Sequence, residues 1–123
     1  MSETGDVVRR LWERFEARDW DRARELLADD LVIEWPGTRE RIRGGDHYLG
    51  LNRTYPEGWA LTVLEIVEAG PRVVSRVRID HGEAVFYATS FFRVEDGRIR
   101  EGVEYFAEQQ EPPYDRSRWA ERT

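Results

Sequence analysis

The second half of this chain is a nearly unbroken series of β-type segments, which limits the fold more than any other feature. The segments are rich in Val, Ile, Phe and Tyr, and short turn signals at 69–71, 81–82 and 95–97 separate them. Connections of two or three residues join neighbouring antiparallel strands. We therefore predict a four-stranded antiparallel meander over residues 61–68, 72–80, 83–94 and 98–106.

The first half has helical periodicity instead. Apolar residues recur on one face of a first helix that Asp6 is placed to cap, namely Val7, Val8, Leu11, Trp12 and Phe15. Asp19 begins a second helix, which we expect to end at Asp29 and Asp30. Residues 31–35 then have the pattern of a strand, stopped by Pro36 and Gly37.

A charged, Gly-containing stretch at 38–45 is expected to be a loop. Asp46 is placed to cap a third, short helix that presents Tyr48, Leu51 and Tyr55 on one face and ends before Pro56. This order predicts an α+β fold in which three N-terminal helices pack on one face of a curved sheet. We interpret 1–123 as a single domain, with a body at about 6–108 and a C-terminal arm at 109–123.

Composition excludes several kinds of chemistry. The chain has no Cys, and all of its 19 basic residues are Arg, which removes disulfides, thiolate metal sites and Schiff-base lysines. Two isolated His residues do not make a zinc site, and a net charge of -6 argues against nucleic acid as a partner. The polar start and the short apolar stretch at 84–92 predict a cytoplasmic protein without a membrane segment.

Three local motifs add a family resemblance to this pattern. They are Leu26-Leu27-Ala28-Asp29-Asp30 before the first strand, Glu95-Asp96-Gly97-Arg98-Ile99 between the last two strands, and the closing Glu104-Tyr105-Phe106. With the order of elements, they resemble the SnoaL-like branch of the nuclear transport factor 2-like superfamily. The resemblance implies a cone of three helices on a strongly curved, mainly antiparallel sheet, and chemistry that needs no cofactor or metal.

That superfamily includes ketosteroid isomerase, limonene epoxide hydrolase, scytalone dehydratase and polyketide cyclases, so the resemblance leaves the activity open. The general base of the isomerase corresponds here to Trp35, and its oxyanion Tyr to Leu11. The Arg-x-Asp pair of the epoxide hydrolase becomes Arg76-Val77-Arg78, and its last-strand Asp becomes Glu104. Neither mechanism is expected in its usual form. The base and the oxyanion donor of the isomerase are missing, and the water-activating Asp of the hydrolase is replaced by an Arg, which does not accept a proton at neutral pH.

The resemblance also places Arg76 and Arg78 on the inner face of the sheet beside Glu104, on alternate positions of their strand. In the catalytic hypothesis, Glu104 is the acid/base, and the two Arg side chains stabilise an oxyanion on a small, mostly apolar ligand with an acidic or carbonyl group. We expect an enclosed pocket for this ligand, lined by Phe15, Trp35, Tyr48, Leu51, Phe86, Ser90, Phe92 and Phe106.

Two alternatives stay open for these charged residues. They form a structural ion-pair cluster in a protein that binds or dimerises without catalysis, or the Arg pair binds an anionic ligand. A further expectation is that the outer face of the sheet is a homodimer interface, because it is too apolar for water. The residues predicted on that face are Ser75, Val77, Ile79, Tyr87, Thr89, Phe91, Val103 and Tyr105. The arm, with Trp119, then wraps the partner or folds back on its own sheet.

Overall fold

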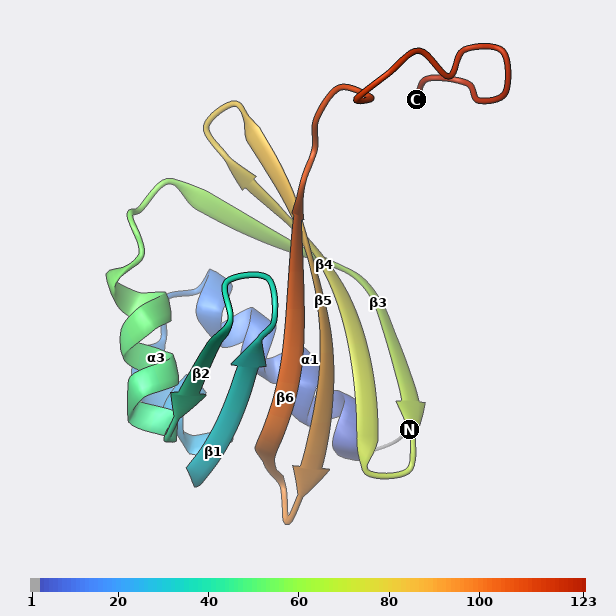
Figure 1. Ribbon diagram of the computed structural model, residues 1–123. Coiled ribbons are helices and arrows are strands. Elements are labelled where there is room, and N and C mark those ends of the chain that lie inside the picture. Colours follow the sequence, from blue (N-terminus) through green and yellow to red (C-terminus); the bar gives the residue numbers. More distant parts are fainter. Residues whose placement is uncertain (1–2) are drawn as a thin grey trace.

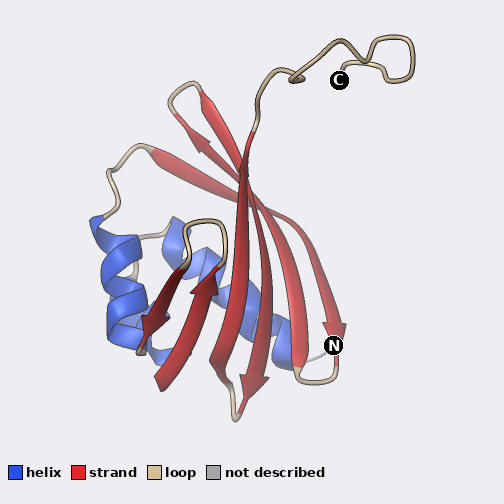
Figure 2. Cartoon of the chain, viewed as in Figure 1, coloured by secondary structure: helices blue, strands red, loops and turns tan. Residues whose placement is uncertain are grey.

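The computed structural model describes residues 3–123 and has one curved sheet with helices on its inner side (Figure 1). The elements are α1 (Glu3–Glu16), α2 (Trp20–Glu25), β1 (Leu27–Trp35), β2 (Glu40–Arg43), α3 (Gly45–Thr54), β3 (Trp59–Ala69), β4 (Arg72–His81), β5 (Ala84–Glu95) and β6 (Arg98–Glu108). The six strands lie in the order β2-β1-β6-β5-β4-β3, antiparallel except for the parallel pair β1 and β6. The sheet is open, with β2 and β3 at its edges (Figure 2). The predicted α+β class is therefore confirmed.

The apolar face predicted for α1 is buried against the sheet. The helix begins earlier than expected, so Asp6 lies in its first turn and is not a cap; a carboxylate there still favours the positive end of the helix dipole. The cap predicted for α2 is present, because the Asp19 side chain accepts a hydrogen bond from the Arg22 backbone N–H at 3.3 Å.

The expected end of α2 at Asp29 and Asp30 was wrong. The helix ends at Glu25, and β1 already begins at Leu27, which is fully buried and pairs with Ile99 of β6. Both aspartates lie within β1 with exposed side chains. Asp29 pairs with Arg24 at 2.6 Å and Asp30 with Arg100 at 2.8 Å. The burial of Leu27 therefore prevails over the helix-ending signal that the paired aspartates give.

The segment expected to be a loop at 38–45 contains β2. Its register places Ile42 opposite Ile33 of β1, and the Ile42 side chain is buried, whereas Glu40, Arg41 and Arg43 are exposed. A single apolar residue among charged ones is sufficient to form this strand. An edge strand pairs with a neighbour on one side only, and its other side is open to water.

The four-stranded meander is confirmed; β3, β4 and β6 are longer than predicted, and β5 has the predicted length but begins and ends one residue later. Asp96 and Gly97 connect β5 to β6 with positive φ angles of 52° and 74°, which is the geometry of the tight turns that twisted hairpins favour. The register opposes Ser75 to Ser90 and Ser90 to Glu104, so one residue from each of β4, β5 and β6 forms a row across the sheet.

This register corrects the predicted orientation of β4. Directly opposed residues share a face, so Ser75 points inward with Ser90, whereas Arg76 and Arg78 point outward. On β4 the predicted faces were reversed: Ser75 and Val77 are fully buried, and Ile79 packs partly buried against the core. The outward orientation is favoured because it spares two guanidinium groups the cost of leaving water.

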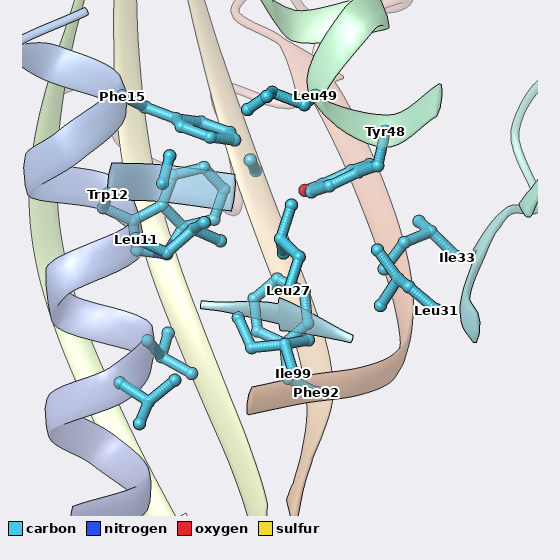
Figure 3. Close-up of a cluster of buried hydrophobic side chains, with 14 of the residues drawn as sticks. Leu11, Trp12, Phe15, Leu27, Leu31, Ile33, Tyr48, Leu49, Phe92 and Ile99 are labelled. Atoms are coloured by element: carbon cyan, nitrogen blue, oxygen red, sulfur yellow. The ribbon is translucent and has the colours of Figure 1, made fainter. Parts of the chain in front are cut away.

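The core fills the space between the helices and the inner face of the sheet. Figure 3 shows the α1 side chains Leu11, Trp12 and Phe15 beside Leu27, Leu31 and Ile33 of β1 and Tyr48 of α3, with the Tyr48 hydroxyl directed into this cluster. At the other end of the chain, the arm at 109–123 leaves β6 and projects from the body (Figure 1). In the part of the chain that the structure describes, no helix is long and apolar enough to span a membrane.

Candidate functional site

Glu104 is a carboxylate in the interior of the protein. It lies in β6 on the inner face of the sheet, and 1% of its surface is exposed. Ser90 stands opposite it on β5, and Ser75 opposite Ser90 on β4, both fully buried. Removing an ionised carboxylate from water is costly unless hydrogen bonds or a counter-charge compensate, so the neighbours of Glu104 decide its chemistry.

Three side chains from three different elements donate hydrogen bonds to this carboxylate. The Tyr48 hydroxyl of α3 donates to Oε1 at 2.8 Å, and the Trp35 indole Nε1–H of β1 donates to the same oxygen at 3.0 Å. The Ser90 hydroxyl donates to Oε2 at 2.6 Å. Glu104 thereby connects α3 and β1 to the centre of the sheet.

The local chain conformation explains how Tyr48 reaches Glu104. Gly44 precedes α3 with a φ of 94°, which favours glycine, and its N–H donates to the Leu31 carbonyl of β1 at 2.6 Å. This turn fixes the start of α3 against β1. Tyr48 lies one helical turn further on, on the face toward the core, and is 1% exposed.

No cation neutralises Glu104 in the part of the chain that the structure describes. The ion pairs found between residues 3 and 123 join other acids, and Glu104 takes part in none of them. Burial raises the pKa of Glu104, and the hydrogen bonds from Ser90, Trp35 and Tyr48 oppose that rise in part. Burial and the neighbouring Glu104 raise the pKa of Tyr48 well above its usual value, so its hydroxyl keeps its proton.

Trp35, one of the donors to Glu104, packs against a second aromatic ring near the surface. Trp35 is partly buried, and its ring meets that of Phe106 edge to face, with centroids 5.5 Å apart. Phe106 is 50% exposed. Ile79 and Phe86, opposed on β4 and β5, continue this partly exposed apolar surface on the same face. We call these four residues the apolar rim: Trp35, Ile79, Phe86 and Phe106.

The predicted cluster of Arg76, Arg78 and Glu104 does not exist in the structure. The Arg76 guanidinium pairs with Glu65 at 2.8 Å and Arg78 with Asp80 at 3.0 Å, both on the outer face. The inward orientation of the two Arg side chains was therefore wrong, and so was the structural ion-pair cluster as an alternative. Glu104 points inward as predicted, because side chains alternate between the two faces along β6 and Glu104 lies at an inward position.

The predicted lining residues fall into two groups. Phe15 and Phe92 are 1% exposed and belong to the solid core, packed around Trp12. Leu51 is 42% exposed on α3. Trp35, Tyr48 and Ser90 meet at Glu104, whereas Phe86 and Phe106 lie in the apolar rim.

The sequence interpretation missed the hydrogen-bonding role of these aromatic residues. Trp35 and Tyr48 were expected as walls only, although a buried indole N–H or phenol hydroxyl usually requires a partner. The same signal applies to Trp12, whose Nε1–H donates to the buried Ser75 hydroxyl at 3.0 Å.

Glu104 does not line either of two hollows on the surface. One, of about 450 Å³, lies between β2 and α3 and includes Arg43, Asp46 and His47. The other, of about 460 Å³, lies between α1 and β3 over Trp12. Within residues 3–123, no three acidic or His side chains come together as metal ligands.

Comparison with known proteins gives one family. A model of the SnoaL-like domain matches residues 8–102. A putative ketosteroid isomerase from Kribbella flavida is 32% identical, with a TM-score of 0.90 over 98% of this chain and 90% of that one. No protein with a curated description matches.

Two further solved structures are similar. An epoxide hydrolase of the LEH-like type from M. tuberculosis is 28% identical, with a TM-score of 0.72 over 85% of this chain and 83% of that one. An NTF-2 like protein of unknown function from Burkholderia xenovorans is 23% identical, with a TM-score of 0.84 over 98% of this chain and 95% of that one. At 23% identity, the similarity to the Burkholderia protein concerns the fold alone.

Proposed function

Since the chain belongs to the family of SnoaL-like domains, we propose that it binds a small, mostly apolar molecule and transfers a proton to or from it through Glu104, without a cofactor. The observation that carries this proposal is a buried carboxylate with three hydrogen-bond donors and no counter-ion among the described residues. A raised pKa brings a carboxylate closer to the range in which a general base or acid works at neutral pH.

Each neighbour of Glu104 has a distinct part in this proposal. Tyr48 and Ser90 hold the two carboxylate oxygens in place from opposite sides of the site. Trp35 contacts the carboxylate and packs against Phe106, and in this proposal displacement of the Trp35 ring opens the carboxylate to the ligand. Phe86 contacts the apolar part of the ligand, whereas Phe15 and Phe92 support the site from the core. Leu51 lines the separate hollow between β2 and α3.

The relatives support a reaction of this class. One similar structure is described as a putative ketosteroid isomerase and another as an epoxide hydrolase, two reactions in which protons move without a cofactor. For this chain we propose isomerisation, cyclisation, dehydration or hydration, with Glu104 as the proton acceptor or donor. In the family resemblance Trp35 corresponds to the isomerase base, so we propose that the proton transfer uses Glu104 on β6 and not a residue of β1.

The experiment compares Glu104→Gln with a matched control on the same strand. Uncharged alicyclic epoxides, unsaturated ketones and alcohols are incubated with the protein, and products are followed by mass spectrometry and NMR. Any turnover by the wild-type protein should fall at least about a hundredfold in Glu104→Gln. Glu101→Gln changes an exposed residue of β6 and should leave turnover unchanged. Equal turnover in all three proteins would refute the proposal.

One observation favours a second, non-catalytic function. Glu104 is almost fully buried, and both of its oxygens accept hydrogen bonds, as in a network that only holds the fold together. In this alternative the protein is a binding or dimerisation module. Glu104→Gln then lowers thermal stability and changes no reaction.

We also propose that the protein forms a homodimer through the outer face of the sheet. Phe91 and Tyr105 meet edge to face there, with centroids 6.2 Å apart, and are 46% and 50% exposed. Trp119 of the arm is 82% exposed, which is costly for a side chain of that size unless a partner covers it. Light scattering on Phe91→Asp and on a chain ending at Glu108 tests the interface and the arm separately. A wild-type monomer at micromolar concentration would refute the dimer.

A further inference from the structure

We infer that the ligand of the Glu104 site is uncharged and presents a hydroxyl group to the carboxylate, in the position that the Trp35 indole N–H occupies. The inference rests on the proposed function in that it uses the same site. It goes further because it names the polar group that the site selects. Three features of the structure support it: the use of the donors, the position of the cations and the apolar rim.

The hydrogen-bond donors around Glu104 are already in use. Tyr48, Ser90 and Trp35 each direct an O–H or N–H to the carboxylate, which as an ionised group only accepts. A ligand carbonyl, which only accepts, finds no free donor among these three side chains. A ligand hydroxyl finds a strong acceptor in Glu104. The site therefore favours donors over acceptors.

The buried Trp59 Nε1–H is a donor without a partner among the described residues, but it belongs to a separate cluster. Its ring packs against Trp20 with centroids 6.4 Å apart, and the Arg18 guanidinium lies over it at 3.3 Å. None of these three residues contributes a hydrogen bond to Glu104. This donor therefore does not change the preference of the Glu104 site.

The cations that would attract an acidic ligand lie on the wrong side of the sheet. Arg76 and Arg78 point outward and pair with Glu65 and Asp80. A ligand carboxylate on the inner face would place a second negative charge near Glu104 in a medium of low dielectric constant. The structure thus reverses the expectation of an acidic ligand that followed from an inward Arg pair.

The apolar rim sets the character of the rest of the ligand. Ile79 and Phe86 oppose each other in the register, and Phe106 opposes Ala88, so these side chains share the face of Glu104. With Trp35 they offer aliphatic and aromatic surface without a charged group of their own. An alicyclic or aromatic body of a few carbon rings matches this surface.

The position of Trp35 explains why the ligand must supply a donor. Opening the site moves the Trp35 ring away from Phe106 and removes its N–H from Oε1. Oε1 then keeps the hydrogen bond from Tyr48 but loses one of its two donors, which is unfavourable for a buried charged oxygen. A ligand hydroxyl restores the lost hydrogen bond, whereas a ketone, an ether or a carboxylate does not.

Three molecules with the same body test this inference: 4-tert-butylcyclohexanol, 4-tert-butylcyclohexanone and 4-tert-butylcyclohexanecarboxylate. Isothermal titration calorimetry at pH 7 measures their dissociation constants with the wild-type protein, Glu104→Gln, Trp35→Phe and Glu101→Gln. We expect the alcohol to bind about tenfold more tightly than the ketone or the carboxylate. Glu101→Gln keeps that preference.

The variants give distinct expected results. In Glu104→Gln the side chain can also donate, so the ratio of alcohol to ketone affinity falls to about one. In Trp35→Phe the competing indole N–H is gone, so the alcohol binds at least as tightly as to the wild type. Near-ultraviolet circular dichroism and thermal unfolding confirm that each variant is folded. If Glu104→Gln does not fold, Trp35→Phe and the wild-type ratios decide the question.

The inference is overturned if the ketone or the carboxylate binds the wild-type protein as tightly as the alcohol. It is also overturned if Glu104→Gln retains the preference, or if none of the three molecules binds at millimolar concentration. These outcomes are separate from failure of the proposed catalysis. An alcohol preference without turnover of any substrate supports the binding inference and refutes the catalytic proposal.

Discussion

The Tyr48 hydroxyl donates a hydrogen bond of 2.8 Å to the Glu104 carboxylate, although the two residues are 56 positions apart in the chain. This bond joins the third helix to the last strand inside the protein. It also means that the phenol keeps its proton, because burial and the neighbouring carboxylate both raise the pKa of Tyr48. Stability and chemistry at this site therefore depend on the same contact.

Tyr48→Phe removes one of the two donors on Oε1 without changing the packing of the ring. We expect the free energy of unfolding at pH 7 to fall by about 1.5–3 kcal/mol, the range for hydrogen bonds to charged groups. Urea unfolding measures this loss. In the Glu104→Gln background the same substitution should cost less, because the acceptor is no longer a carboxylate. Additive effects of the two substitutions would contradict the coupling.

The stability of Glu104→Gln relative to the wild type should depend on pH. Because burial raises the pKa of Glu104 in the folded state, the folded protein holds this proton more tightly than the unfolded chain. The stability that the protonated Glu104 contributes is fully present below the unfolded-state pKa of Glu104, and it is lost as pH rises through the folded-state pKa. The variant lacks this loss, so its stability relative to the wild type should increase from pH 4 to pH 7.5. A constant difference across that range, measured by urea unfolding, would contradict the raised pKa.

Arg76→Ala should have a small effect, in contrast to substitutions at Glu104. The Arg76 side chain is 52% exposed and pairs with the equally exposed Glu65, so its loss should change the free energy of unfolding by less than about 1 kcal/mol. The alcohol preference of the Glu104 site should stay the same. A changed preference in the calorimetric titration would place Arg76 in the site after all.

Gly102→Ala tests the packing of β6 beside Glu104. A Cβ at this position would lie 2.6 Å from Cδ1 of Phe92 and 3.0 Å from Cδ1 of Ile33. Overpacking of this kind typically costs about 1–3 kcal/mol. Gly37→Ala is the control, since a Cβ there meets nothing within 4 Å. Equal unfolding midpoints for the two variants would mean that this part of the core is looser than the structure indicates.

The class of fold could be predicted well from the sequence because several local patterns agree with one another. The hairpin turns at 81–82 and 95–97 are short and Gly-containing, and the α1 face has clear helical spacing. The start of β1 was missed because Leu27 pairs with Ile99, far along the chain, and β2 was missed because its single apolar residue, Ile42, is buried through its pairing with Ile33 of β1. Local propensity carries no information about such partners.

The candidate site could be predicted only in part for a related reason. Strand β4 has Val at 73, 74 and 77, so both of its faces contain apolar residues and the alternation does not decide which face is buried. The pairing with β5 decides it, by opposing Ser75 to Ser90. A shift of one residue reverses a whole strand, which moved both Arg side chains from the predicted site to the outer face.

Measuring the pKa of Glu104 is the most direct test of the central claim, that Glu104 is an internal carboxylate without a counter-ion. Carbon-13 NMR of the Glu side-chain carboxyl groups, with Glu104 assigned by comparison with Glu104→Gln, gives its titration midpoint. The structure predicts a midpoint above the ordinary Glu value of about 4.3. A midpoint at or below that value, as an ion pair with an Arg would produce, would contradict the account.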